Sequence, residues 1–92
     1  MTATIIADKK LNTPGTLKLL AEIRAARGGD ARIDASGVEM LGALALQVLL
    51  SARASWAADG HAFDVTPRSE PVEGALALTG LAPADLATGD AA

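Results

Sequence analysis

The sequence predicts a single small α/β domain, in which a three- to four-stranded mixed sheet packs against three or four helices. Short β-prone runs alternate with segments of helical character, an order typical of strand–helix–strand units with parallel neighbours and right-handed crossovers. The length of 92 residues fits one domain. A hydrophobic content of 50% is enough for one compact core.

The first strand and helix are predicted within residues 3–27. Residues 3–7 form a short β-prone run. Asn12 or Thr13 can cap the helix that follows, and Pro14 suits its first position. Two glycines at 28–29 end this helix, which is predicted over residues 14–27. Its apolar residues recur on one side at helical spacing: Leu17, Leu19, Leu20, Ile23 and Ala26.

The second helix is predicted over residues 42–59, which contain no proline and no glycine after the first position. A short strand at 31–35 and a Ser-Gly turn precede it. The helix is apolar over most of its circumference, so it is either buried or covered by a partner. Gln47, Ser51 and Ser55 form a narrow polar stripe, which is either the solvent face of a mostly buried helix or a strip that faces a partner.

The third strand is predicted over residues 61–66 and ends at Pro67. Ser69 can cap a third helix, which Gly80 ends. Residues after 82 are rich in alanine and polar residues without a period. We therefore expect the domain to span residues 1–82 and residues 83–92 to form a loose tail.

Composition excludes several classes of function. The net charge is −3 and the eight Lys and Arg residues are scattered, which argues against nucleic acid as a ligand. The absence of cysteine removes thiolate metal sites and cysteine nucleophiles, and it fits a reducing cytosol. The longest strongly apolar stretch, residues 41–50, is about half of what a membrane span requires. We expect a cytoplasmic protein without membrane insertion.

No catalytic or cofactor site is predicted. His61 is the only histidine, and no second His or Cys exists to complete a metal site. Asp34 and Ser36 lack a nearby general base, so Ser36 is interpreted as a residue that hydrogen-bonds the backbone within the turn. We predict that the protein is not an enzyme and needs no cofactor.

Three local strings resemble those of a known family in their order and their intervals. They are Leu-Asn-Thr-Pro at 11–14, Ile-Asp-Ala-Ser-Gly-Val at 33–38 and Leu-Thr-Gly-Leu at 78–81. On these strings the chain resembles the STAS domains, the fold of the anti-sigma-factor antagonists, over residues 3–82. The run at 41–52 further resembles small STAS proteins encoded within chemotaxis gene clusters of alphaproteobacteria, which implies a role in signal transduction.

The chain departs from the family at one informative position. STAS domains usually carry Asp-Ser-Ser-Gly or Asp-Thr-Gly-Gly at the start of the second helix, where a partner kinase phosphorylates the Ser or Thr. Ala43 stands at that acceptor position and has no hydroxyl group. We therefore expect this position to be non-phosphorylatable, with Ser36 as the alternative phosphosite.

The resemblance implies a regulator that acts by protein–protein interaction with a signalling kinase, an anti-sigma-type protein or a chemotaxis protein. An alternative is an accessory subunit of a phospholipid-transport ABC ATPase, although that variant of the family keeps a Thr where Ala43 stands. A homodimer is also open. The residues predicted to bind the partner are Asn12, Thr13, Gly42, Ala43, Leu44, Gln47 and Ser51.

Overall fold

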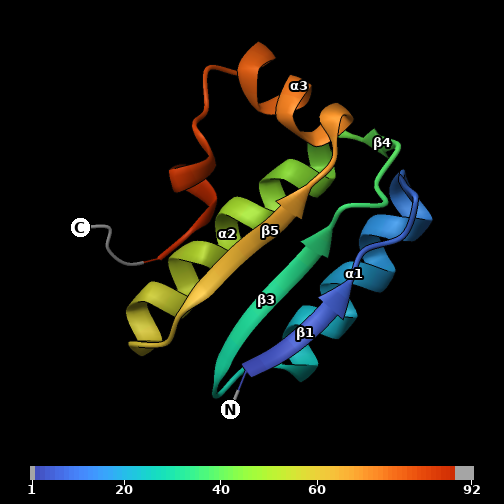
Figure 1. The fold of residues 1–92 in the computed structure, drawn as a ribbon. Helices are drawn as coiled ribbons and strands as arrows, with labels where there is room; N and C mark the ends of the chain where they lie inside the picture. Colours follow the sequence, from blue (N-terminus) through green and yellow to red (C-terminus); the bar gives the residue numbers. More distant parts are fainter. Residues whose placement is uncertain (1, 89–92) are drawn as a thin grey trace.

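Strands and helices alternate along residues 2–88, the part of the chain that the computed structural model describes (Figure 1). The strands are β1 (Thr2–Ile6), β2 (Lys10–Leu11), β3 (Asp30–Ala35), β4 (Met40–Leu41) and β5 (Phe63–Arg68). The helices are α1 (Thr13–Ala25), α2 (Ala43–Asp59), α3 (Glu70–Leu78) and the short 3-10 helix η1 (Pro83–Leu86). The predicted α/β class is confirmed.

The main sheet has the strand order β1-β3-β5, and both of its strand pairs are parallel. The short strands β2 and β4 form a separate parallel pair. The expectation of a mixed sheet is wrong, because within residues 2–88 no antiparallel pair occurs. The reason is the connectivity: α1 lies between β1 and β3 in the chain, α2 lies between β3 and β5, and each such crossover returns the chain in the same direction.

Helix α1 begins where the sequence predicts. The Asn12 side chain accepts a hydrogen bond from the Gly15 N–H at 3.1 Å, which satisfies one free donor of the first turn. The buried side of α1 is formed by Gly15, Thr16, Leu19 and Ile23. Leu17 is 57% exposed, so the prediction that it shares the buried side is wrong. The buried positions of α1 recur every three to four residues and form one stripe along the helix. Leu17 does not fall on this stripe.

Helix α2 matches its predicted range to within one residue, and Gly60 ends it with a φ of 77°. Its buried stripe consists of Ala45, Leu46, Leu49, Ala52 and Trp56. The Trp56 ring lies 5.6 Å from the Phe63 ring, centroid to centroid, and its Nε1–H donates to the Gly29 carbonyl at 2.8 Å. These contacts fix the carboxyl-terminal half of α2 against the sheet.

Strand β5 continues through Pro67 to Arg68, two residues beyond its predicted end. The pairing with β3 is irregular between Ile33 and Ala35, so the strand accommodates Pro67 at an irregular point of the ladder. Ser69 then caps α3: its hydroxyl accepts from the Val72 N–H at 3.4 Å and donates to the Val38 carbonyl at 2.6 Å. The predicted cap of the third helix is therefore confirmed.

The predicted loose tail is wrong for residues 83–88. Pro83–Leu86 form η1, and Leu86 is fully buried in the core. Thr88 exchanges two hydrogen bonds with Phe63, from its N–H to the Phe63 carbonyl at 2.9 Å and from the Phe63 N–H to its Oγ1 at 2.8 Å. The buried Leu86 side chain and the hydrogen bonds of Thr88 together anchor the segment. Residues 89–92 lie outside the described residues.

Both long helices lie on the same face of the main sheet, and α3 lies beyond one end of it (Figure 1). The core lies between this face and the helices. The opposite face carries exposed side chains such as Thr4, Arg32 and Asp64, which is unusual for a parallel sheet. No helix within residues 2–88 is both long and apolar enough to cross a membrane.

Candidate functional site

The first turns of α1 and α2 lie next to each other at the carboxyl end of the sheet. The β2–β4 pair aligns Leu11 with Leu41, and the Gly42 N–H donates to the Leu11 carbonyl at 3.1 Å. Asn12 and Thr13 follow directly and are both exposed. The structure thus brings the predicted residues Asn12, Thr13, Gly42 and Ala43 together, although 28 intervening positions separate Thr13 from Gly42 in the sequence.

The first turn of α2 has no side-chain cap. Gly42 occupies the N-cap position, and no side chain accepts from the free N–H groups of the turn. A Cβ atom at Gly42 would lie 3.2 Å from the Leu11 carbonyl oxygen, so the close approach of the two helix starts favours glycine here. Ala43 is exposed in this first turn and offers only a methyl group to a partner.

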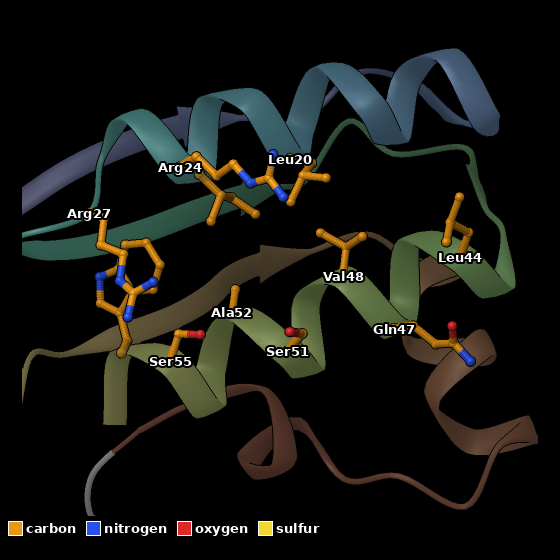
Figure 2. A pocket seen from close by; sticks show the side chains of 11 residues that line it. Leu20, Arg24, Arg27, Leu44, Gln47, Val48, Ser51, Ala52 and Ser55 are labelled. Atoms are coloured by element: carbon orange, nitrogen blue, oxygen red, sulfur yellow. The ribbon is translucent and has the colours of Figure 1, made fainter. Parts of the chain in front are cut away.

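A groove of about 450 Å³ runs between α1 and α2 (Figure 2). We call it the α1–α2 groove. Helix α1 lines it with Leu20, Ile23, Arg24 and Arg27. Helix α2 lines it with Leu44, Gln47, Val48, Ser51, Ala52, Ser55 and Trp56. Three of the predicted partner-binding residues therefore face this groove: Leu44, Gln47 and Ser51.

The charge of the α1–α2 groove is positive, in contrast to the net negative charge of the chain. Its lining includes two arginines and no acidic residue. Arg27 forms a two-pronged contact with Asp59, at 2.8 Å from Nε to Oδ2 and 3.2 Å from Nη2 to Oδ1. These hydrogen bonds raise the pKa of Arg27 and lower the pKa of Asp59. Arg24 forms no ion pair with a side chain in residues 2–88, so its charge is free to meet a ligand.

A second groove, of about 360 Å³, lies between α2 and α3, and we call it the α2–α3 groove. Its lining contains no charged residue: Leu41, Gly42, Ala43, Leu46, Gln47, Leu50, Ala75, Leu78 and Thr79. Leu78 is 90% exposed at the rim of this groove. Gln47 lines both grooves and therefore lies between them, about one helical turn after Leu44.

Ser36 lies outside this surface. Its hydroxyl donates to the Asp34 carboxylate at 2.7 Å, and its N–H donates to the same oxygen at 3.0 Å. The two bonds lower the pKa of Asp34, because they favour the ionised carboxylate. The partner of Ser36 is therefore the Asp34 side chain, where the sequence interpretation named the backbone. Ser36 lines neither groove.

The sequence did not predict the walls that face α2. Leu20 was expected on the apolar side of the first helix, and no site was predicted at Arg24, Arg27 or Leu78. One pattern in the sequence could have indicated this wall. Leu20, Arg24 and Arg27 are spaced by four and three residues, so on a helix the two cations lie on the same side as the leucine. That pattern did not reveal which helix would pack beside it.

The described residues contain no group of three or more His, Asp or Glu side chains placed to hold a metal ion. The side chains that line the two grooves are apolar, neutral polar or cationic. Comparison of the chain with protein-family models, with curated proteins and with solved structures found no match.

Proposed function

We propose that this protein is a non-enzymatic STAS-type regulator that binds a cytoplasmic signalling protein through the first turns of α2. The observation that carries the proposal is the position of Leu44, which is 46% exposed at the start of an uncapped helix and lines the α1–α2 groove. An exposed leucine at the edge of a groove provides an apolar anchor for a partner, and a few buried anchors carry most of the energy of an interface.

The chemistry of the two grooves defines the complementary surface of the partner. The α2–α3 groove has only apolar and neutral side chains, so it fits an apolar side chain of the partner. The α1–α2 groove adds Arg24, while Arg27 is already paired with Asp59, so the groove fits a partner that presents a carboxylate beside its apolar contacts. Gln47 supplies a hydrogen-bonding group between the two.

Ala43 determines how such a regulator is controlled. It occupies the exposed first turn of α2, and an alanine side chain has no oxygen to accept phosphate. Binding is therefore not switched by a kinase at this position. We propose that the partner, or the amount of this protein, sets the extent of binding.

The experiment places a photo-reactive amino acid at position 47 and, as a control, at position 32 on the open sheet face. We expect a discrete cross-linked protein from cell lysate at position 47 and none at position 32. Mass spectrometry of the product then distinguishes a signalling kinase or regulator from an ABC ATPase subunit.

The identified partner is purified and its affinity measured by calorimetry. Leu44→Glu should weaken binding at least about thirtyfold, because it places a charge on the apolar anchor. Leu17→Glu is the matched control, since Leu17 is an exposed helical leucine that lines neither groove. Full affinity of Leu44→Glu, or an equal loss from both variants, would show that the surface is elsewhere.

A further inference from the structure

The two edges of the main sheet differ in how their backbone groups are satisfied. The Ala31 N–H donates to the Ala62 carbonyl at 3.0 Å, so Ala62 faces β3. Backbone groups alternate along a strand, and the N–H and C=O groups of Phe63 and Val65 therefore point outward from β5. All four of these outward groups find a partner within the chain.

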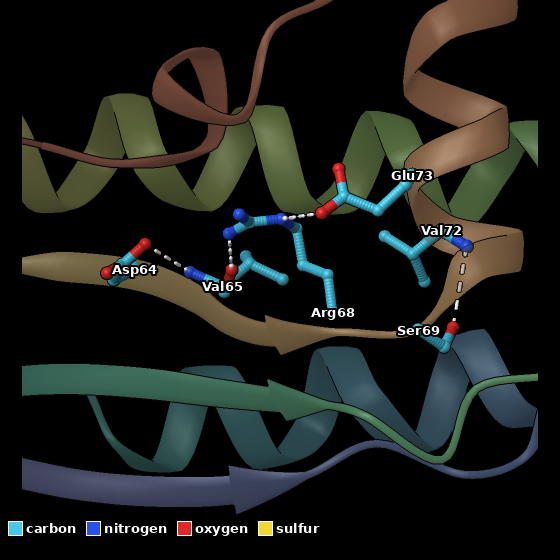
Figure 3. Close-up of polar contacts among 6 residues, drawn as sticks. All are labelled: Asp64, Val65, Arg68, Ser69, Val72 and Glu73. Carbon is cyan, nitrogen blue, oxygen red and sulfur yellow. Dashed lines mark hydrogen bonds and ion pairs between the residues drawn. The ribbon is translucent and has the colours of Figure 1, made fainter.

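Figure 3 shows two of the partners at Val65. The Val65 carbonyl accepts from Arg68 Nη1 at 2.7 Å, and its N–H donates to the Asp64 carboxylate at 2.8 Å. The Arg68 guanidinium is held in place by Glu73 of α3, with 3.2 Å between Nε and Oε2. At Phe63, Thr88 satisfies both groups. The β5 edge is thus closed to another strand.

The β1 edge has no such protection. The Ala7 N–H donates to the Asp34 carbonyl at 3.0 Å, so the odd-numbered residues of this segment face β3. The N–H and C=O groups of Thr2, Thr4 and Ile6 point outward by the same alternation. Residues 2–88 form no hydrogen bond to these outward groups. An edge strand with free backbone groups is a template for another strand.

The side chains of β1 also lack the features that keep edge strands apart. Thr2–Ile6 contains no charged residue, no proline and no irregularity in its pairing with β3. Ile6 is 72% exposed, although it is a large apolar side chain. The charged residues Asp8 and Lys9 follow only after the strand has ended.

We propose that the β1 edge binds the β1 edge of a second copy of this chain, antiparallel and about a two-fold axis at Thr4. This register places Thr4 opposite Thr4 and Thr2 opposite Ile6, so every outward group on one strand meets a complementary group on the other. On the helix side it places Ala3 opposite Ile5. All cross-strand pairs are uncharged, and most involve β-branched side chains, which stabilise such pairs.

A second copy fits this edge because the strand is complementary to itself. A two-fold axis generates the interface from one surface patch, and the register about Thr4 uses all three outward residues of β1. The axis is perpendicular to the sheet, so the helices of both copies lie on the same side. The two α1–α2 grooves then open toward the same side. This inference does not depend on the proposed function.

The first experiment measures the mass of the untagged protein in solution by sedimentation equilibrium. The strand has five residues, so we expect a weak association and a measurement at about 100 µM. The expected mass is twice the 9.3 kDa of one chain. A monomer at this concentration would overturn the proposal.

Variants at Thr4 locate the interface. Thr4→Lys and Thr4→Glu should each be monomeric, because each places two like charges opposite one another at the axis. An equimolar mixture of the two should recover the doubled mass, because lysine then lies opposite glutamate. Thr66→Lys, the same change on β5 and on the same face of the sheet, should remain dimeric. A dimer of Thr4→Lys equal to that of the parent would also overturn the proposal.

Amide hydrogen exchange tests the unaltered protein and so does not depend on the folding of a variant. In the dimer the Thr2, Thr4 and Ile6 amides are bonded, so their exchange should slow as concentration rises. The Ala3 and Ile5 amides, which already bond to β3, should show a smaller change. Exchange at Thr4 that stays fast at every concentration would contradict strand pairing.

Discussion

The two halves of α2 differ in how they are held by the rest of the molecule, and the more hydrophobic half is the one that leaves a large apolar side chain exposed. The carboxyl-terminal half, residues 51–59, is held by Trp56, which is 1% exposed and bonded to Gly29, and by Arg53, whose Nε donates to the Ala87 carbonyl at 2.9 Å. The amino-terminal half, residues 43–50, leaves Leu44 exposed at the α1–α2 groove. Side-chain hydrogen bonds anchor the carboxyl-terminal half, whereas the amino-terminal half combines the buried residues Ala45, Leu46 and Leu49 with the exposed Leu44.

This difference teaches that hydrophobicity along a helix does not decide which residues are buried. Leu44 and Trp56 are both large and apolar, yet Trp56 is 1% exposed and Leu44 is 46% exposed. Trp56 contacts β5 through Phe63 and the turn after α1 through Gly29. The start of α2 lies at the carboxyl end of the sheet, near α3 and β4 (Figure 1). Anchoring and binding are thus separated along one helix.

The largest effect is expected at the anchor. Trp56→Ala should lower the free energy of unfolding by about 3–5 kcal/mol, because it removes a large buried ring and leaves the Gly29 carbonyl without its donor. Urea denaturation followed by circular dichroism measures the loss, since Trp56 is the only tryptophan. Trp56→Phe keeps a ring against Phe63 and should lose less. An effect below about 1 kcal/mol for Trp56→Ala would contradict its role as the anchor.

The next largest effect is expected at η1. Leu86→Ala should cost about 2–4 kcal/mol of unfolding free energy, because Leu86 is fully buried beside α2 and β5. Leu78→Ala is the matched control, because Leu78 is 90% exposed and its removal should change stability by less than about 0.5 kcal/mol. Equal effects of the two substitutions would mean that the segment after α3 does not hold the helix.

A smaller effect on stability is expected at Leu44, where the binding effect is large. Leu44→Glu loses the burial of about half a leucine but gains a negative charge in the first turn of α2, which the helix dipole favours. The two contributions oppose each other, so the unfolding free energy should change by less than about 1 kcal/mol. Thermal unfolding checks this. A large loss would place Leu44 in the core and remove it from the binding surface.

The smallest effect is expected at the Arg27–Asp59 pair, which lies at the rim of the α1–α2 groove. The folded state lowers the pKa of Asp59 from 3.8, so the pair stabilises the fold above that pH and stops doing so as the pH falls through the lowered value. Asp59→Asn should therefore be slightly less stable than the parent at neutral pH and equal to it in strong acid. Denaturation at a series of pH values checks this. A difference that is the same at every pH would contradict a charge effect.

Local signals in the sequence predicted most of the fold. Asn12 and Ser69 cap their helices and Gly60 ends α2, because each acts through bonds or dihedral angles within a few residues. The predictions failed where distant segments meet. Leu17 was placed on the buried side of its helix, and Leu86 was placed in a loose tail, because periodicity does not say which other element covers a side chain.

The candidate site follows the same division. Gly42, Ala43, Leu44 and Gln47 were predicted as one surface because they are neighbours on one helix, and Asn12 and Thr13 join them at the same end of the fold. The second wall of each groove was not predictable, since Leu20 and Arg24 belong to α1 and Leu78 belongs to α3. Their approach to α2 depends on how the helices pack.

The sequence by itself determined the order of the elements, the positions where helices begin and end, and the absence of a hydroxyl group at Ala43. Only the tertiary structure decided that Leu44 stays exposed, that Leu86 is buried, and that the β5 edge is closed while the β1 edge is open. The physical reason is the distance along the chain between the residues that interact. Caps and turns depend on neighbouring residues, whereas burial and the pairing of edge strands depend on residues that the fold brings together from distant positions in the chain.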